Sequence, residues 1–229
     1  MQNRILGVIV GLLVVYFLVA YIVMPTWWRR YEHRHPALDN LPGITQTGNH
    51  IPGDPINVAI IGSKADFIKI MLAAKWHPAD PLSLKSSLEI AEATVLKRPY
   101  EDAPVSNLFY WGRKEDLAFE QPVGDDPRKR HHVRFWKSDQ VDDAGNPLWA
   151  GSATFDERVG LSHTTGQITH HIAADVDAER DHLFDTLSST GKLTARDIIP
   201  NFHKIREGKN GGGDPWKTDG SLWLGVLRE

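Results

Sequence analysis

The sequence predicts an α/β or α+β domain with a mixed β-sheet and flanking helices, preceded by one N-terminal transmembrane helix. The first observation is an unbroken apolar run, Ile5–Met24, near the start of the 229-residue chain. The second is a series of short segments rich in β-branched and aromatic residues, separated by turn residues, which is typical of strands. The third is a small set of segments with apolar residues at helical spacing. Together they predict one anchor and one folded domain.

The apolar run has the length of a membrane span, because twenty residues in a helix cover about 30 Å. Arg4 precedes it, Pro25 ends it, and the aromatic residues Trp27, Trp28 and Tyr31 follow where interfacial aromatics belong. A core helix rarely runs this long without a charge, and a signal peptide would end in a small-x-small cleavage site. We therefore expect an uncleaved single-pass anchor in a bacterial inner membrane.

The flanking charges give opposing indications of which side the domain faces. Arg29, Arg30 and Arg34 follow the run, and counting them literally favours the cytoplasm. Only four residues precede the run, and such a short tail is typical of a bacterial anchor whose domain lies outside the cytoplasm. We expect the soluble domain in the periplasm.

Composition bounds the remaining classes. The formal net charge is −3, so general nucleic-acid binding is not expected. The chain lacks cysteine, which is compatible with either redox compartment, and has 11 histidines that are unevenly distributed. We expect a tail at residues 1–4, the transmembrane helix at 5–24, a stalk at 25–51 and one domain at 52–229.

The first part of the domain is expected to begin with a strand and two helices. Glu32–Asp54 is rich in Pro and Gly without periodicity, so it is interpreted as a stalk that ends in a turn at Pro52–Pro55. Ile56–Ile61 is a short β-branched run and predicts a buried strand. Ser63 can cap a helix that runs through Trp76, and Leu82–Leu96 has a second helical stripe.

The rest of the chain has a strand-rich middle, followed by one helix and a final strand. The apolar face of the helix is formed by Val176, Leu183, Phe184 and Leu187. The expected elements are strands at Asn107–Trp111, Asp116–Val123, Arg130–Trp136 and Leu148–Phe155, a strand or loop at Gln167–Ile172, a helix at Val176–Leu187 and a central strand at Ser221–Leu227.

The densest chemical cluster is the basic segment of the third strand. Side chains alternate along a strand, so Arg130, His132 and Arg134 should share one face, while His131 and Val133 share the other. Two guanidinium groups beside an imidazole suit a phosphate, because guanidinium binds such oxygens in a bidentate manner. The alternative is a solvated basic strand edge that discourages aggregation.

The second cluster is histidine-rich. His132, His163 and His171 are the candidate metal ligands, and a divalent metal such as zinc would be the cofactor. A carboxylate such as Glu120 or Asp156 could complete the set, and so could Asp175. Adjacent histidines in a strand point to opposite faces, so at most one of each pair should serve one centre. The alternative is a set of structural or surface histidines.

Several ordered motifs resemble the LssY C-terminal domain family. They are Gly53–Val58, Lys97–Tyr100, Asp116–Gly124, Arg130–Trp136, Ala153–Asp156, Gly160–His163, Thr169–Ile172 and Thr218–Gly220. The resemblance runs from about Pro52 to Leu227. The family is named for a protein associated with type I secretion, and in longer members the domain accompanies membrane segments of the lipid-phosphatase and DedA-like kinds. A single anchor replaces those segments here.

Two functions fit this pattern. The first is a membrane-anchored envelope module whose domain binds an anionic, phosphate-bearing ligand, such as a lipid headgroup, or a partner protein. The ligand-binding candidates, which also lie in the family motifs, are Arg130, Arg134, His131, His163, His170 and Asp156.

The second is a membrane-tethered hydrolase of phosphate esters that uses a metal. In this hypothesis Arg130 and Arg134 bind the phosphoryl oxygens. His132 or His171 acts as general acid/base or metal ligand, and Glu120 or Asp156 orients it.

Overall fold

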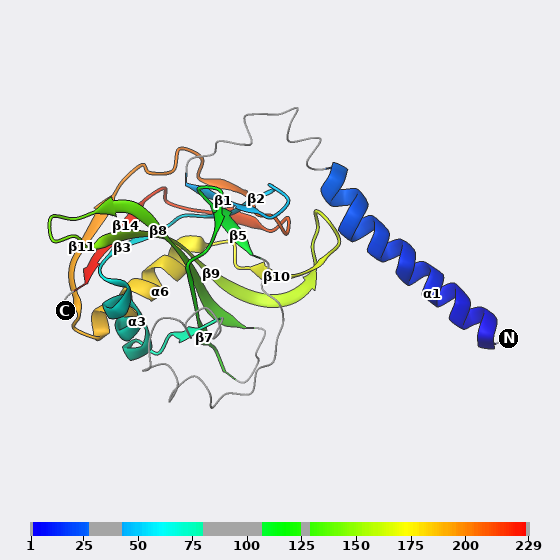
Figure 1. Ribbon diagram of the computed structural model, residues 1–229, viewed down its shortest axis with the longest axis horizontal. Helices are drawn as coiled ribbons and strands as arrows, with labels where there is room; N and C mark the ends of the chain where they lie inside the picture. The colour runs from blue at the N-terminus through cyan, green and yellow to red at the C-terminus, as the bar shows by residue number, and fades with distance from the viewer. Residues whose placement is uncertain (1, 28–42, 80–106, 125–128, 228–229) are drawn as a thin grey trace.

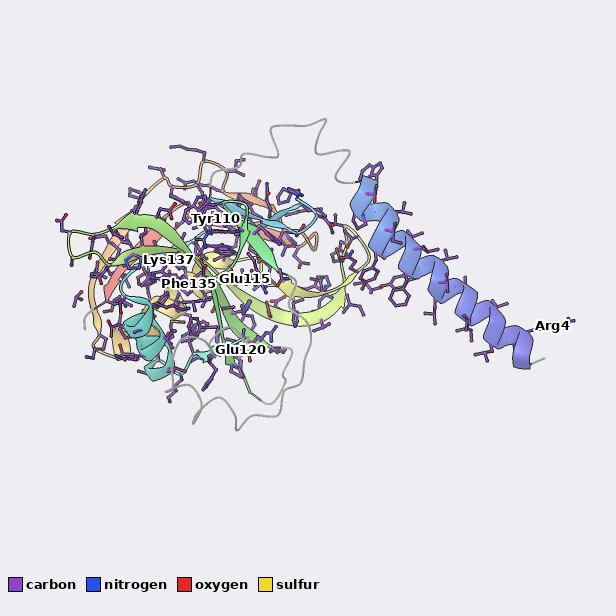
Figure 2. The ribbon with its side chains drawn as sticks, viewed as in Figure 1. Arg4, Tyr110, Glu115, Glu120, Phe135 and Lys137 are labelled. Atoms are coloured by element: carbon purple, nitrogen blue, oxygen red, sulfur yellow. The ribbon has the colours of Figure 1, made fainter. Side chains whose placement is uncertain are left out.

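An N-terminal helix projects from a folded domain in the computed structural model (Figure 1). The described residues are 2–27, 43–79, 107–124 and 129–227. Helix α1 (Gln2–Leu18) continues into a short π-helical segment, η1 (Val19–Val23). The helical span Arg4–Trp27 has 24 residues and is apolar enough to cross a membrane. Arg4 lies at its far end from the domain (Figure 2).

The domain is built on an eight-stranded mixed sheet, as the sequence predicts. Strands β14 and β3 pair in parallel, and the other neighbouring strands of this sheet pair antiparallel. The strand order is β11 (Leu193–Ile199), β14 (Leu222–Leu227), β3 (Val58–Ile61), β9 (Pro147–Leu161), β8 (Arg130–Val141), β7 (Leu117–Pro122) and β4 (His77–Pro78), with β10 (Ile168–Ile172) paired to β9.

Two smaller sheets complete the strand structure. The four-stranded sheet has the order β2 (Pro52–Pro55), β1 (Ile44–Thr47), β5 (Leu108–Tyr110) and β6 (Arg113–Lys114). The two-stranded sheet pairs β12 (Glu207–Lys209) with β13 (Pro215–Lys217).

Two helices begin at side-chain caps, and the first of these is the cap that the sequence predicts. The Ser63 hydroxyl accepts a hydrogen bond from the Asp66 amide at the start of α3 (Lys64–Ala73). The Asp175 carboxylate accepts one from the Ala178 amide at the start of α6 (Val176–Ser189). The four apolar residues that the sequence assigns to the inner face of α6 are all buried.

These elements form three layers. Apolar side chains of α3 and α6, such as Phe67 and Phe184, pack with Val133 and Phe135 of β8 in the largest core cluster. Trp136 points to the other face of the sheet, where it joins a cluster that includes Leu108 of β5. Figure 1 shows β1, β2 and β5 grouped together, apart from α3 and α6. The polar side chains that alternate with Val133 and Phe135 therefore lie between the two sheets.

The irregular stalk predicted for Glu32–Asp54 is wrong in its last part. Ile44–Thr47 forms β1, and Pro52–Pro55 forms β2 instead of a turn. Pro and Gly conceal these short strands because they lack the apolar alternation on which the sequence interpretation depends. The helix predicted through Trp76 ends at Ala73, and Lys75 adopts a positive φ of 65°. The helix predicted at Leu82–Leu96 lies outside the described residues.

Candidate functional site

Strand β8 carries a row of polar side chains into the space between the two larger sheets. Its neighbours are β7 and β9, so β8 is an interior strand and the solvated-edge alternative is wrong. Arg130 is 11% exposed at its side chain, whereas His132 and Arg134 are 1% and 6% exposed as residues. The shared face predicted for these three residues is therefore present, and it is buried.

Arg130 connects three strands through its guanidinium group. Its Nη1 donates to Glu120 Oε2 of β7 at 2.8 Å, and its Nε donates to Asp156 Oδ2 of β9 at 3.0 Å. Its Nη2 lies 3.3 Å from His170 Nε2 of β10. Glu120 and Asp156 therefore position this arginine. The prediction that they orient His132 or His171 is wrong, because neither ring nitrogen of His132 has a hydrogen-bond partner and His171 pairs with a different carboxylate.

Arg134 faces a carboxylate from the small sheet. Its Nη1 lies 3.6 Å from Asp54 Oδ2 in β2, and the Asn210 side-chain amide donates to Asp54 Oδ1 at 3.0 Å. Burial raises the pKa of Asp54, although the Arg134 guanidinium opposes this. Burial likewise raises the pKa of Asp156 against the opposing effect of Arg130. These charged groups are held away from bulk water at a cost in free energy, which is common at functional sites.

Several uncharged polar groups on the same face lack hydrogen-bond partners. Both ring nitrogens of His132 are buried without a hydrogen bond, and so are the hydroxyls of Thr154 and Ser152. These two residues lie opposite His132 and Arg134 on β9. Burial, with the nearby arginines, holds the pKa of His132 well below its ordinary value, so this imidazole is neutral. Buried polar groups are normally hydrogen-bonded, and exceptions in a native fold call for a ligand or bound water.

A pocket of about 310 Å³ opens between the two sheets next to this row. Arg134, Asp54 and Asp156 contribute buried charges to its wall. The β9–β10 hairpin supplies polar groups to one side of the pocket, and the loop after β12 lines another side. The remaining polar lining residues are Thr47, Asn49, Asn107, Ser162, Thr165, Gln167, Thr169, His170 and Asn210.

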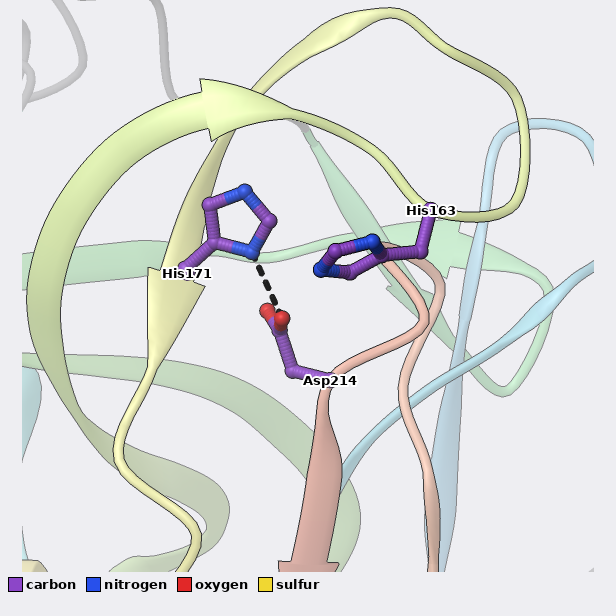
Figure 3. A group of neighbouring side chains, drawn as sticks. All are labelled: His163, His171 and Asp214. Carbon is purple, nitrogen blue, oxygen red and sulfur yellow. Dashed lines mark hydrogen bonds and ion pairs between the residues drawn. The ribbon is translucent and has the colours of Figure 1, made fainter.

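A separate group gathers His163, His171 and Asp214 beside this pocket (Figure 3). One ligand atom from each residue lies within 4.8 Å of the others. His171 Nδ1 is 2.6 Å from Asp214 Oδ1, and the rings of His163 and His171 have centroids 5.2 Å apart. Two of the three candidate metal ligands are therefore brought together. His132 is not a member of this group.

His170 and His131 have different surroundings although both are predicted ligand-binding residues. His170 lines the pocket, and burial together with Arg130 and Arg134 lowers its pKa to about 4. His131 lies on the helix side of the sheet, where its Nδ1 is 2.7 Å from Glu179 and its ring stacks on His182 at 3.7 Å. Burial raises the pKa of Glu179 and lowers that of His182. His131 is therefore not part of the pocket wall.

Sequence reasoning missed three polar residues of these groups, namely Asp54, Asn210 and Asp214. Asp54 was hidden in the Pro-Gly segment interpreted as a turn. Asn210 and Asp214 flank the glycine run 211–213. A polar residue on each side of three glycines is the signal that could have indicated a site, because such a loop allows close backbone approach.

Comparison with known families covers the same region. The family model described as LssY C-terminus matches residues 38–222. The chain belongs to this family. The LssY C-terminus match confirms the resemblance in the sequence motifs, and it begins before Pro52, so it includes β1 and β2. A search of curated proteins and a search of solved structures each found no match.

The N-terminal helix of this LssY C-terminus protein contacts the hairpin that lines the pocket. The Tyr16 hydroxyl donates to the Gly166 carbonyl oxygen at 2.7 Å, and the Gln167 side-chain amide donates to the Ala20 carbonyl oxygen at 3.1 Å. Ala20 is only 3% exposed. One wall of the pocket is thus attached to the helix that is apolar enough to cross a membrane.

Proposed function

We propose that this protein is a membrane-anchored envelope protein that binds a phosphate-bearing, hydroxyl-rich headgroup in the pocket between its two sheets. The observation that carries the proposal is the set of buried charges in the pocket wall, Arg134, Asp54 and Asp156. Burying these charges opposes folding, and ligand pockets in proteins combine such converging polar groups with a concave surface.

The chemistry of the wall defines the ligand class. Arg134 supplies a cationic guanidinium for one phosphate group. Asp54 and Asp156 are acceptors for hydroxyl groups, and Asn210 offers both a donor and an acceptor. A ligand with several negative charges would meet the two carboxylates, so the arrangement favours a single phosphate next to hydroxyl groups.

The position of the pocket supports a membrane-borne source. Gln167 lines the pocket and also bonds to Ala20, which lies inside the apolar span Arg4–Trp27, so a bound headgroup would lie close to the lipid around a helix that crosses a membrane. The domain would lie on the periplasmic side. Because the chain has no cysteine, a single Lys137→Cys variant and a membrane-impermeant maleimide test that side in whole cells.

Binding is tested with the full-length chain in phospholipid nanodiscs, using glycerol phosphate as a soluble probe and phosphatidylglycerol as a lipid probe. We expect Arg134→Gln to weaken binding at least ~10-fold, since it removes a charge-assisted contact. Asn49→Trp should block the pocket without touching its buried charges. Lys137→Gln removes an exposed charge from the same strand and should leave binding unchanged.

The two probes separate the sources of the ligand. Preference for phosphatidylglycerol over phosphatidylcholine nanodiscs would support a lipid headgroup, whereas binding of glycerol phosphate alone would support a soluble ligand of the same chemistry. Absence of binding for both probes, or equal binding by Asn49→Trp, would refute the proposal.

The second candidate function is hydrolysis of a phosphate ester. The observation that favours it is the His163, His171 and Asp214 group beside the pocket, because two imidazoles and a carboxylate can hold a metal-bound water. Turnover of a glycerophosphate ester by the full-length protein, lost in His163→Ala, would support this function. Binding without turnover would leave the first proposal standing alone.

A further inference from the structure

We propose that His163, His171 and Asp214 form a binding site for a divalent transition metal, with zinc as the best match. The three residues come from separate places in the chain: the turn after β9, strand β10 and the loop before β13. Figure 3 shows their side chains converging on one point. This site does not depend on the identity of the headgroup proposed above.

The group combines a buried pair with an exposed third residue. The side chains of His171 and Asp214 are 3% and 6% exposed, whereas His163 is exposed. A metal that binds here would have two ligands fixed inside the fold and one at the surface. Three protein ligands leave at least one coordination position of a tetrahedral zinc ion for water or a ligand, as in catalytic zinc sites.

Backbone contacts hold two of the three ligands, His163 and Asp214, in place before any metal arrives. The His163 amide donates to the Gly212 carbonyl oxygen at 2.7 Å. The second oxygen of Asp214 accepts from the Ile172 amide at 3.3 Å, and the Asp214 amide donates to Asn210 Oδ1 at 2.9 Å. Hydrogen bonds of this kind orient metal ligands and raise metal affinity.

Close approach of the glycine loop depends on Gly213. This residue has a φ of +85°, and a Cβ atom added to it would lie 2.7 Å from the Cβ atom of His163. Any larger residue would push the loop that carries Asp214 away from His163. Gly213 therefore explains how the Asp214 carboxylate reaches the two imidazoles. A hydrogen bond between His171 and Asp214 alone would not require this close approach of the loop to His163.

The donor set selects the class of metal. Two imidazole nitrogens and one carboxylate suit zinc and other divalent transition metals, whereas calcium and magnesium prefer oxygen ligands alone. The same set occurs in iron(II) centres with two histidines and one carboxylate. Metal analysis distinguishes these ions.

The metal group and the pocket share one connecting residue. Asn210 accepts from the Asp214 amide through Oδ1 and donates to Asp54 through Nδ2. Asp54 lines the pocket, as do residues 210–212. Occupancy of the metal group would therefore stiffen one wall of the pocket.

The test uses the full-length protein in detergent, without a polyhistidine tag, equilibrated with zinc and then freed of excess metal. We expect one zinc per chain by elemental analysis, and a cobalt derivative with the visible absorption of a low-coordinate site. His163→Ala should weaken zinc binding by at least ~100-fold, since loss of a direct ligand exceeds the effect of losing an outer hydrogen bond. His163 is exposed, so this variant is expected to fold.

A matched control is His182→Gln, which removes an imidazole from α6 on the other side of the sheet and should leave zinc binding unchanged. Asp214→Asn, checked for folding by circular dichroism, should weaken binding as His163→Ala does. Absence of zinc after equilibration, or equal zinc content in His163→Ala, would overturn the site. Headgroup binding measured in the presence of chelator reports separately on the proposed function.

Discussion

The surroundings of the pocket histidine His170 strongly lower its pKa. Burial and the charges of Arg130 and Arg134 lower this pKa to about 4. The Arg130 guanidinium lies 3.3 Å from the Nε2 atom, so the neutral ring can accept a hydrogen bond there. Protonation would remove this acceptor and add a positive charge beside two others. At neutral pH the residue is therefore a neutral hydrogen-bonding group of the pocket wall.

This pKa predicts how stability changes with pH. The folded value lies below the ordinary histidine value of about 6.5, so the unfolded chain binds the proton first as pH falls. The stability contributed by neutral His170 is complete above about pH 6.5 and is lost as pH falls towards 4. We expect His170→Gln to show a smaller decrease in Tm than wild type between pH 7.5 and pH 4.5, measured by thermal unfolding. An equal decrease in both proteins would contradict this interpretation.

Substitution of Asn57 should affect stability alone, because this residue is purely structural. It is fully buried, and its side-chain amide donates to the Ala153 and Val176 carbonyl oxygens while its Oδ1 accepts from the Ala153 amide. Asn57→Ala would leave these backbone groups without partners, and we expect a loss of about 2–4 kcal/mol in the free energy of unfolding. Denaturant titration measures it. The exposed Asn107 is the control, and Asn107→Ala should change stability by less than ~0.5 kcal/mol.

The sequence predicts which residues share a face better than which residues they contact. Strand periodicity placed Arg130, His132 and Arg134 together because alternation is a local property of the backbone. Asp54, which faces Arg134, and Asn210, which donates to Asp54, lie far away in the chain, and no local pattern relates them to β8. The same holds for Asp214 beside His171, which only the loop between β12 and β13 brings close.

At the scale of elements, the β9–β10 hairpin is the link between the pocket and the N-terminal helix. Leu161 and Ile168 are cross-strand neighbours near its tip, and they are 56% and 58% exposed. The Ile168 amide donates to the Tyr21 hydroxyl of the helix at 3.4 Å. A helix that crosses a membrane would thus bring these two apolar side chains close to lipid, where burying them is favourable.

We predict that residue 168 contacts lipid. The emission of an environment-sensitive fluorophore on Ile168→Cys, measured in nanodiscs, should be blue-shifted and brighter than the emission of the same fluorophore in water. Ile198 in β11 is a matched control, since it is 51% exposed and lies in the strand at the edge of the sheet. Figure 1 shows β11 at the end of the domain away from α1. The same fluorophore on Ile198→Cys should show the emission of a probe in water; identical spectra at both positions would refute the lipid contact.

Elements with strong periodicity or clear caps were predictable, and those without were not. Ser63 and Asp175 mark the starts of α3 and α6, and β3 was evident from its β-branched residues. Strands β1 and β2 escaped prediction because they are stabilised by non-local pairing, of β1 with β2 and of β1 with β5, despite poor local strand propensity.

At the scale of the whole molecule, composition and periodicity predict the class of fold and its N-terminal apolar helix but not its topology. The parallel pairing of β14 with β3 joins residues from the two ends of the domain, and the sequence contains no signal for it. The packing of the small sheet over the polar face of the large one is equally non-local. It determines that the basic face of β8 becomes the wall of a pocket instead of a solvated surface.

The contact between the N-terminal helix and the hairpin makes a prediction about the whole molecule. Tyr16 and Gln167 provide two of the hydrogen bonds that join the helix to the domain. If these bonds fix the orientation, spin labels on Arg4→Cys and Lys137→Cys should give a narrow distance distribution in nanodiscs. Adding Tyr16→Phe and Gln167→Ala should broaden it, because each change removes one donor. Thr26→Ala, which affects only a hydrogen bond within the helix, should leave the distribution narrow. A broad distribution in the otherwise unmodified protein would show that the domain moves independently of its anchor, and the pocket would then have no fixed position relative to the membrane.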